Sequence, residues 1–182
     1  AARETYAARI TAYHIGKYAG ATGAQGTQER SGEKVKAIGR TIRESLYKAR
    51  RSLEAVKPYR PADLSEDAMA DMLSTPNENR LRLVVYALEQ GWSIDRINQL
   101  TSIDSWFLDQ IQQLAEIQIA LRGHTLGEIS AETLRSAKEN GSSDRRIGYL
   151  TGSEPHAVRP LRHQQGPVPL FTCVSPRPRP PP

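Results

Sequence analysis

The apolar residues of this 182-residue chain recur at helical spacing through most of its length. After residue 60, apolar positions return every three or four residues, which is the period of an amphipathic helix. The apolar runs begin at Ser, Thr or Asp and several end at Gly, the residue types preferred at the two ends of helices. No strand pattern follows residue 60. We therefore expect this part of the chain to be α-helical throughout.

Two of these helical runs, residues 91–111 and 141–161, are the same module written twice, and they align without a gap. The first reads GWSIDRINQLTSIDSWFLDQI and the second GSSDRRIGYLTGSEPHAVRPL. Each copy predicts a glycine stop, a serine cap, a short helix, a tight turn and a second capped helix, which together form a helix-turn-helix unit. We expect two similar helix pairs, packed through Ile97, Leu100, Ile147 and Leu150.

Capping residues place the other helix boundaries. Ser65 is predicted to cap a helix that runs through Met69 and Met72. In the run Thr75-Pro76-Asn77-Glu78, threonine is predicted to cap the next helix, with proline at its first position and glutamate completing a capping box. That helix should bury Leu81, Val84, Val85 and Leu88 and end at Gly91. Asp104 should begin a helix that reaches about Leu121, and Ser130 a helix (Leu134, Ala137) that ends at Gly141.

The first 60 residues have a different pattern. Strand-forming residues alternate roughly in 5–18 (Tyr6, Ile10, Tyr13, Ile15), 20–28 has the composition of a loop, and 34–39 is a short strand candidate. Thr41 to Glu44 forms a capping box, which predicts a helix with Leu46, Ala49 and Leu53 on one face. Pro58 and Pro61 predict a linker.

Charge is unevenly distributed along the chain. The net charge of +5 combines +8 in residues 1–60, −7 in 61–120 and +4 in 121–182, so the centre is acidic. The single cysteine, Cys173, excludes an internal disulfide and is compatible with a reducing, cytoplasmic compartment. No apolar run approaches the length of a membrane span, and no signal peptide opens the chain.

A helix-turn-helix unit can read DNA, but a reading helix must offer Arg, Lys, Asn or Gln to base edges. The second helix of the first copy instead carries Asp104, Asp109 and Glu116, and no Lys or Arg. The second copy has Arg159 and Arg162, but Pro160 lies inside its helix. A helical packing module is therefore favoured over DNA binding.

No catalytic or ligand-binding set emerges from the motifs. Gly20, Gly23 and Gly26 lack the Gly-Lys-Ser/Thr that completes a phosphate loop. The four histidines are too scattered to share a metal ion, and Cys173 has no partner, so surface histidines and an inert thiol are expected. Trp106-Phe107, the largest apolar feature, is interpreted as part of the core, with an anchor for a partner protein as the alternative. The histidines are His14, His124, His156 and His163.

Three segments resemble the large subunit of carbamoyl-phosphate synthetase and occur in the same order as in that family, over about residues 5–165. They are GTQERSGEKVKAIGRTIRESLYKARRSLE, ENRLRLVVYALEQGWSIDRINQLTSIDSWFLDQIQQLAEIQ and SSDRRIGYLTGSEPHAVRPLRHQQG. The most specific pieces are AIGRT, SLYKARRSLE and IDSWFLDQI.

The resemblance implies a mainly α chain with a small β remnant. Residues 1–55 would be the end of the first ATP-grasp domain, which phosphorylates bicarbonate. Residues 56–165 would be the helical oligomerisation domain, containing both helix-turn-helix-like repeats, and 166–182 a divergent, disordered Pro-rich tail.

The family is an ATP-dependent ligase that makes carbamoyl phosphate from bicarbonate, ATP and glutamine-derived ammonia for arginine and pyrimidine synthesis. Its partners are a small amidotransferase subunit and other large-subunit copies, and its cofactors are ATP and Mg or Mn. Its nucleotide-binding and metal-binding residues lie upstream of the part present here. We therefore expect no catalytic, cofactor-binding or metal-binding residue in this chain, and neither nucleic acid nor membrane as a partner.

The chain departs from the family at both ends. Near the N-terminus, the residues after the Gly-Glu pair in RSGEKVKAIGR depart from the order usual in the family. Near the C-terminus, the sequence that the family has after Thr172-Cys173 is replaced by VSPRPRPPP. The chain also begins at Ala1 rather than at methionine, and its Pro-rich end stops abruptly, so both ends look like cuts. Truncation or a shifted reading frame explains the tail better than a polyproline ligand does. Two alternatives stay open: a nucleic-acid-binding protein, and a chain whose partial sheet prevents stable folding.

Overall fold

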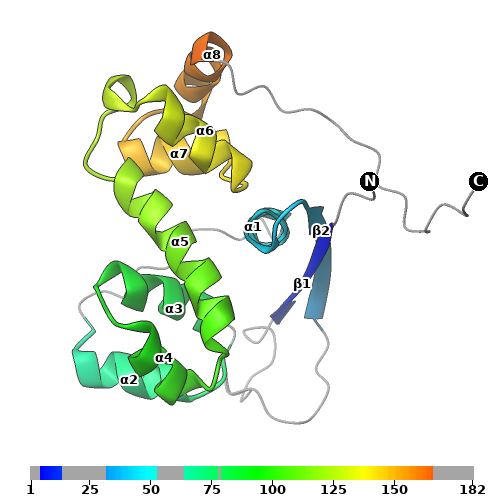
Figure 1. Cartoon of the computed structure of the whole chain (residues 1–182), viewed down its shortest axis with the longest axis vertical. Coiled ribbons are helices and arrows are strands. Elements are labelled where there is room, and N and C mark those ends of the chain that lie inside the picture. The colour runs from blue at the N-terminus through cyan, green and yellow to red at the C-terminus, as the bar shows by residue number, and fades with distance from the viewer. Residues whose placement is uncertain (1–4, 14–31, 53–63, 78, 166–182) are drawn as a thin grey trace, which may run out of the picture.

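The computed structural model describes residues 5–13, 32–52, 64–77 and 79–165. Figure 1 shows a β-hairpin and one helix beside two groups of helices, which a long diagonal helix joins. The elements are β1 (Tyr6–Tyr13), β2 (Gly32–Gly39), α1 (Ile42–Ser52), α2 (Glu66–Ser74), α3 (Arg80–Glu89), α4 (Ile94–Thr101), α5 (Ser105–Leu121), the short 3-10 helix η2 (Leu126–Glu128), α6 (Ala131–Glu139), α7 (Asp144–Thr151) and α8 (Pro155–Gln165). The prediction of a mainly α chain with a small N-terminal β part is confirmed.

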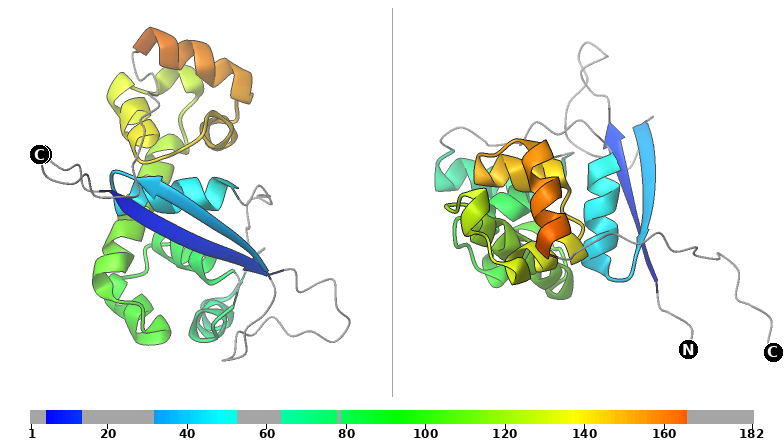
Figure 2. Two further views of the ribbon diagram at one scale, coloured as in Figure 1. Left: turned by 90° about the vertical axis from the view of Figure 1, so that its right-hand side faces the viewer. Right: turned by 90° about the horizontal axis from the view of Figure 1, so that it is seen from above.

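The hairpin pairs β1 with β2 in antiparallel register, from Tyr6 opposite Gly39 to Tyr13 opposite Gly32. Alternate residues face α1, so Ala8 is buried and Ala37 is partly buried, whereas Arg9 and Lys36 are exposed on the other face. Figure 2 shows α1 between the hairpin and the helical groups. The second strand was predicted correctly. The first is confirmed to Tyr13, and its predicted continuation lies outside the described residues.

The capping box before α1 forms in a modified way. The Glu44 amide donates to Thr41 Oγ1 at 3.1 Å, as predicted. The Glu44 carboxylate, however, accepts from the Arg40 amide at 2.7 Å rather than from the amide of Thr41. Both interactions still occupy amides at the start of the helix, which is the physical purpose of a cap. Ala49 is buried and Leu46 partly buried, and Leu53 lies outside the described residues.

Two separate hydrophobic clusters form the core of the helical part. The first cluster, built by α2, α3, α4 and α5, includes Leu73, Leu83, Ile97 and Leu108. The second, built by α5, α6, α7 and α8 with Ile129, includes Leu121, Leu134, Ile147 and Val158. Helix α5 contributes to both clusters, and Figure 1 shows it running from one group to the other.

The two copies of the repeated module form equivalent structures. Helices α4 and α7 span equivalent residues, and Ser93 and Ser143 accept the amides of Arg96 and Arg146 at 3.2 and 3.1 Å. The four residues predicted to pack the helix pairs are buried or partly buried: Ile97, Leu100, Ile147 and Leu150. The pair from the first copy packs in the first cluster and the pair from the second copy in the second, so each copy packs its own core.

The tight turn of each copy requires a left-handed residue. Ser102 in the first copy has φ 54° and Gly152 in the second has φ 65°. Glycine adopts this conformation without a steric cost, whereas serine brings its Cβ close to the backbone. Among the described residues, Ser102 is the non-glycine residue with positive φ.

The predicted start of the third helix was wrong. Thr75 ends α2 instead of capping α3, because its amide donates to Asp71 O. The Asn77 side chain accepts the Asn79 amide at 2.9 Å and donates to Met72 O at 2.9 Å, which holds the chain in a turn. Such local side-chain bonds compete with helix formation, so α3 begins only at Arg80.

The remaining helix boundaries agree with their predicted caps. Ser65 and Ser130 accept the amides of Ala68 and Thr133, and Asp104 accepts the amide of Trp106. The described part of the chain contains no β-strand after residue 60. None of its helices is both long enough and apolar enough to cross a membrane. The predicted loop 20–28, the linker around Pro58 and Pro61, and the tail 166–182 lie outside the described residues.

Exchange of the two turn residues tests the strain at Ser102. We expect Ser102→Gly to raise the free energy of unfolding by about 0.5–1 kcal/mol, since relief of left-handed strain exceeds the added chain entropy. Gly152→Ser should lower it by a similar amount. Urea unfolding followed by circular dichroism would measure both, and destabilisation by Ser102→Gly would contradict the assignment.

A second test concerns the close contact inside the second copy. A Cβ added at Gly148 would lie 2.6 Å from the backbone oxygen of Ser153 and 3.2 Å from the amide nitrogen of Pro155. Because backbone atoms cannot move aside cheaply, Gly148→Ala should cost about 1–3 kcal/mol of folding free energy. Gly127→Ala is the control, since no atom lies within 4 Å of its added Cβ. Equal melting temperatures for the two variants would refute this packing.

Candidate functional site

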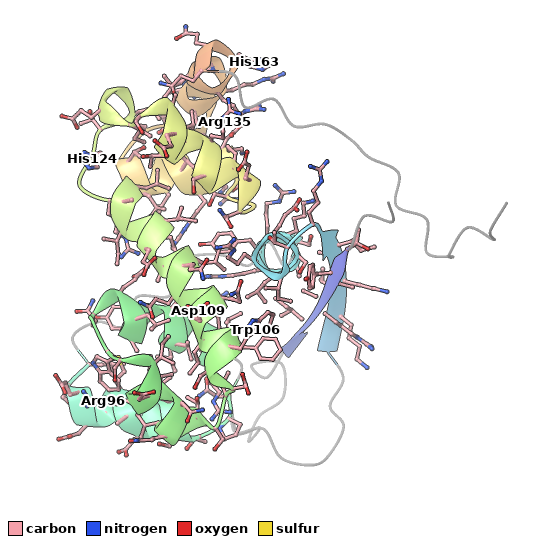
Figure 3. All side chains as sticks on the ribbon, in the orientation of Figure 1. Arg96, Trp106, Asp109, His124, Arg135 and His163 are labelled. Carbon is pink, nitrogen blue, oxygen red and sulfur yellow. The ribbon has the colours of Figure 1, made fainter. Side chains whose placement is uncertain are left out.

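The aromatic pair at the start of α5 is exposed, so the prediction that it belongs to the core was wrong. Trp106 is 51% and Phe107 48% exposed. Their rings meet edge to face, with centroids 4.9 Å apart and an interplanar angle of 82°. Figure 3 shows Trp106 at the end of α5 nearest α4.

Helix phase explains the exposure of Trp106, and position at the helix end that of Phe107. The buried stripe of α5 is Leu108, Ile111, Leu114, Ala115, Gln118 and Leu121. Each residue turns about 100° around the helix axis, so Trp106 points away from the stripe. Phe107 lies one turn before Ile111 on the same face as the stripe, but it belongs to the first turn of α5, where the stripe ends. The aromatic pair is therefore available to another surface.

The helix expected to read DNA in a helix-turn-helix protein is committed to packing here. The buried stripe of α5 faces the two clusters, and Asp109 accepts hydrogen bonds from Gln110 and Gln113. In α8, Arg162 is buried and lies 3.5 Å from the Asp144 carboxylate. Arg159 remains exposed. This arrangement does not favour DNA binding.

The predicted surface histidines lie apart. His124, His156 and His163 are all exposed, as expected, and Figure 3 shows His124 and His163 far from each other. No group of three His, Cys, Asp or Glu residues among the described residues could hold a metal ion. His14, Cys173 and the three glycines Gly20, Gly23 and Gly26 lie outside the described residues.

Two carboxylates form ion pairs with basic side chains of other helices. In the second group, Asp144 of α7 lies 2.9 Å from Lys138 Nζ on α6 and 3.5 Å from Arg162 on α8. Burial lowers the pKa of Lys138, and the hydrogen bond to Asp144 opposes that shift. In the first group, Glu66 of α2 lies 3.0 Å from Arg96 of α4. These ion pairs tie the short helices of each group together.

A polar cluster lies where α1 meets both helical groups. We call it the junction cluster, and it consists of Tyr47 and Arg50 from α1, Glu89 from α3, Gln118 from α5, Arg122 after α5, and Arg146 from α7. Arg122 Nη1 donates to Glu89 Oε2 at 2.7 Å, and Arg146 donates to Gln118 Oε1. The Tyr47 side chain is only 8% exposed. The sequence analysis did not identify this cluster.

Burial governs the titration of the junction cluster. It raises the pKa of Tyr47, and the neighbouring Arg50 and Arg146 oppose that shift. It also lowers the pKa of Arg50 and of Arg146. A guanidinium stays protonated in proteins even when it is partly desolvated. The arginines of the cluster therefore keep their positive charges inside the molecule.

The sequence matches one protein family over residues 34–166: carbamoyl-phosphate synthetase large chain, oligomerisation domain. A carbamoyl phosphate synthase large chain from Acidobacterium capsulatum is 39% identical over 171 residues, which are 92% of this chain and 16% of the relative. The N-terminal section of the large chain from Aquifex aeolicus is 35% identical over 92% of this chain and 30% of its own length.

A third relative is the arginine-specific, chloroplastic large chain of Arabidopsis thaliana, which is 32% identical over 92% of this chain and 15% of its own length. The chain thus spans a small part of the relatives that it matches. Its helical groups and α1 fall inside the matched region. The chain therefore belongs to the carbamoyl-phosphate synthetase large-chain family, and residues 34–166 are its oligomerisation domain.

Proposed function

We propose that this chain is a structural connector that holds catalytic domains of a carbamoyl-phosphate-synthesising enzyme in register. The observation that supports this most directly is the double packing of α5, which contributes side chains to both hydrophobic clusters. Helix α1 contacts both the hairpin and α5. A movement of the hairpin is thereby transmitted to the helical groups, as a connector requires.

The complete enzyme would make carbamoyl phosphate from bicarbonate, ATP and glutamine-derived ammonia, for arginine and pyrimidine synthesis. The name of the arginine-specific relative supports the arginine route. ATP and Mg or Mn would bind to parts of the enzyme outside this chain, since the resemblance places the family's nucleotide-binding and metal-binding residues upstream of it. A small amidotransferase subunit would be a partner, and a reducing, cytoplasmic compartment fits the single cysteine.

The chain would also associate with other large-chain copies, and Trp106-Phe107 is our candidate contact. Association through this family's oligomerisation domain needs an exposed apolar surface, and large aromatic side chains supply much of the energy at protein interfaces. The pair is about half exposed, and the carboxylates on its helix exclude a polyanion as its partner. A protein surface is therefore the occupant that we propose.

Replacement of both aromatic residues tests this contact. We expect the double variant Trp106→Ser, Phe107→Ser to weaken self-association by at least about tenfold, since loss of interface aromatics costs about 2 kcal/mol or more. Sedimentation equilibrium over a range of concentrations would measure the change. The variant should remain folded, as circular dichroism would show, because neither side chain belongs to a buried cluster.

Ile119→Ser is the matched control. Ile119 is 48% exposed on the same helix, about three turns from Phe107. Self-association of this variant should equal that of the unchanged chain. If the aromatic variant and the control associate with equal affinity, Trp106-Phe107 is not the contact.

We also expect no bicarbonate-dependent ATP hydrolysis by this chain alone. The connector role assigns catalysis to other parts of the enzyme. A coupled assay of ADP release, with a complete large chain as the positive control, would measure it. ATP turnover that depends on bicarbonate and exceeds the no-protein rate would overturn this expectation.

A further inference from the structure

The junction cluster carries more positive than negative charge among the described residues. Arg50, Arg122 and Arg146 interact with one another or with Tyr47, while Glu89 is the carboxylate that they share. Glu89 Oε2 already accepts from Arg122, and Arg146 donates to the neutral Gln118 amide. A partly desolvated charge needs a counter-charge or several hydrogen bonds to be stable. The cluster therefore favours the addition of an anion.

Several buried polar atoms of the junction cluster lack a hydrogen-bond partner. They are Tyr47 Oη, Glu89 Oε1, Gln118 Nε2 and Arg122 Nε. Tyr47 is 8% exposed and Gln118 is fully buried, so an unmade hydrogen bond is costly at both side chains. Three of the four atoms are donors or can donate. An acceptor with several oxygen atoms would complement them.

The repeated module shows that Arg146 has a special position. Its equivalent in the first copy, Arg96, stacks over Trp92 with 3.6 Å from the guanidinium carbon to the ring centroid, and pairs with Glu66. Arg146 also lies over an aromatic ring, with 5.6 Å from its guanidinium carbon to the centroid of Tyr149, but in addition it interacts with Tyr47, Gln118 and Arg122. The same position of the module thus lies over an aromatic ring in both copies, and in the second copy it also supplies a cation to the junction cluster.

We propose that the junction cluster binds a small oxyanion, of the phosphate or sulfate class, between α1, α5 and α7. Arg146 and Arg50 supply the charge, and the Tyr47 hydroxyl and the Gln118 amide donate hydrogen bonds. Arginine is suited to this role because its planar array of donors matches oxyanion geometry. Glu89 limits the affinity by repulsion, which Arg122 reduces by pairing with it. The bound anion would fasten α1 to both helical groups.

Titration of the full chain with inorganic phosphate tests the site. In low-salt buffer free of other oxyanions, isothermal titration calorimetry should show saturable binding of about one phosphate per chain. Sodium chloride at the same ionic strength should not reproduce the heat or the accompanying rise in melting temperature. Sulfate should compete with phosphate, whereas stronger competition by acetate would reassign the site to a carboxylate and overturn the proposed class.

Variants locate the site. Arg146→Gln should weaken phosphate binding by about tenfold or more, since a charge-assisted hydrogen bond is lost. Tyr47→Phe should weaken it by a smaller factor and preserve the shape of the side chain. Arg96→Gln is the matched control, because it removes the equivalent arginine of the other copy, and binding should be unchanged.

Circular dichroism separates loss of binding from loss of folding. If Arg146→Gln unfolds the chain, Tyr47→Phe and Gln118→Met carry the test, because both keep the side-chain volume. Absence of saturable phosphate binding by the unchanged chain would overturn the proposal. Equal weakening by Arg96→Gln and Arg146→Gln would do so too, since the binding would then be non-specific. The proposal does not depend on the connector role, which the association and ATP assays test separately.

Discussion

The burial of one helix in two hydrophobic clusters is the constraint on which the rest of this structure depends. Helix α5 has 17 residues and is therefore about 25 Å long. Leu108, Ile111 and Ala115 lie in the first cluster, and Leu121 lies in the second. A helix-turn-helix pair alone has too little apolar surface for a stable core, so each copy needs neighbouring helices to cover it. The shared helix makes each cluster a neighbour of the other.

The N-terminal hairpin depends on α5 indirectly, through α1. A two-stranded hairpin is marginally stable by itself, and here α1 covers one of its faces. Helix α1 in turn contacts α5, where Arg43 donates to Gln113, and reaches the second helical group where Tyr47 lies beside Gly141. The hairpin thus depends on its contacts with α1, and α1 on its contacts with the helical groups.

Features that depend on residues close in sequence could be predicted, and features that depend on how the helices pack could not. The caps at Ser65, Ser93, Ser130 and Ser143 were predictable because a cap involves residues two or three positions apart. The start of α3 was missed because Asn77 forms a turn that competes with the predicted cap. Burial of Trp106 was predicted from residue type, whereas the rotational phase of α5 decides it.

The junction cluster shows the same limit for charge. Its members come from four helices and from the residue after α5, and lie up to 99 positions apart, from Tyr47 to Arg146. A linear count of charges therefore separates residues that the fold brings together. Along the sequence the centre of the chain is acidic. In the folded molecule, the junction cluster nevertheless carries a net positive charge.

The glycine that begins each copy has different neighbours, and this makes the two copies unequal. Both adopt positive φ, but no atom lies within 4 Å of a Cβ added at Gly91, whereas one added at Gly141 would lie 3.0 Å from Tyr47 Cβ. Gly91 is constrained only by its positive φ, a conformation that asparagine also adopts at helix ends. The second is also held by α1. The duplicated modules are therefore not interchangeable parts: a side chain at Gly91 would strain only the local backbone, whereas one at Gly141 would also press against α1.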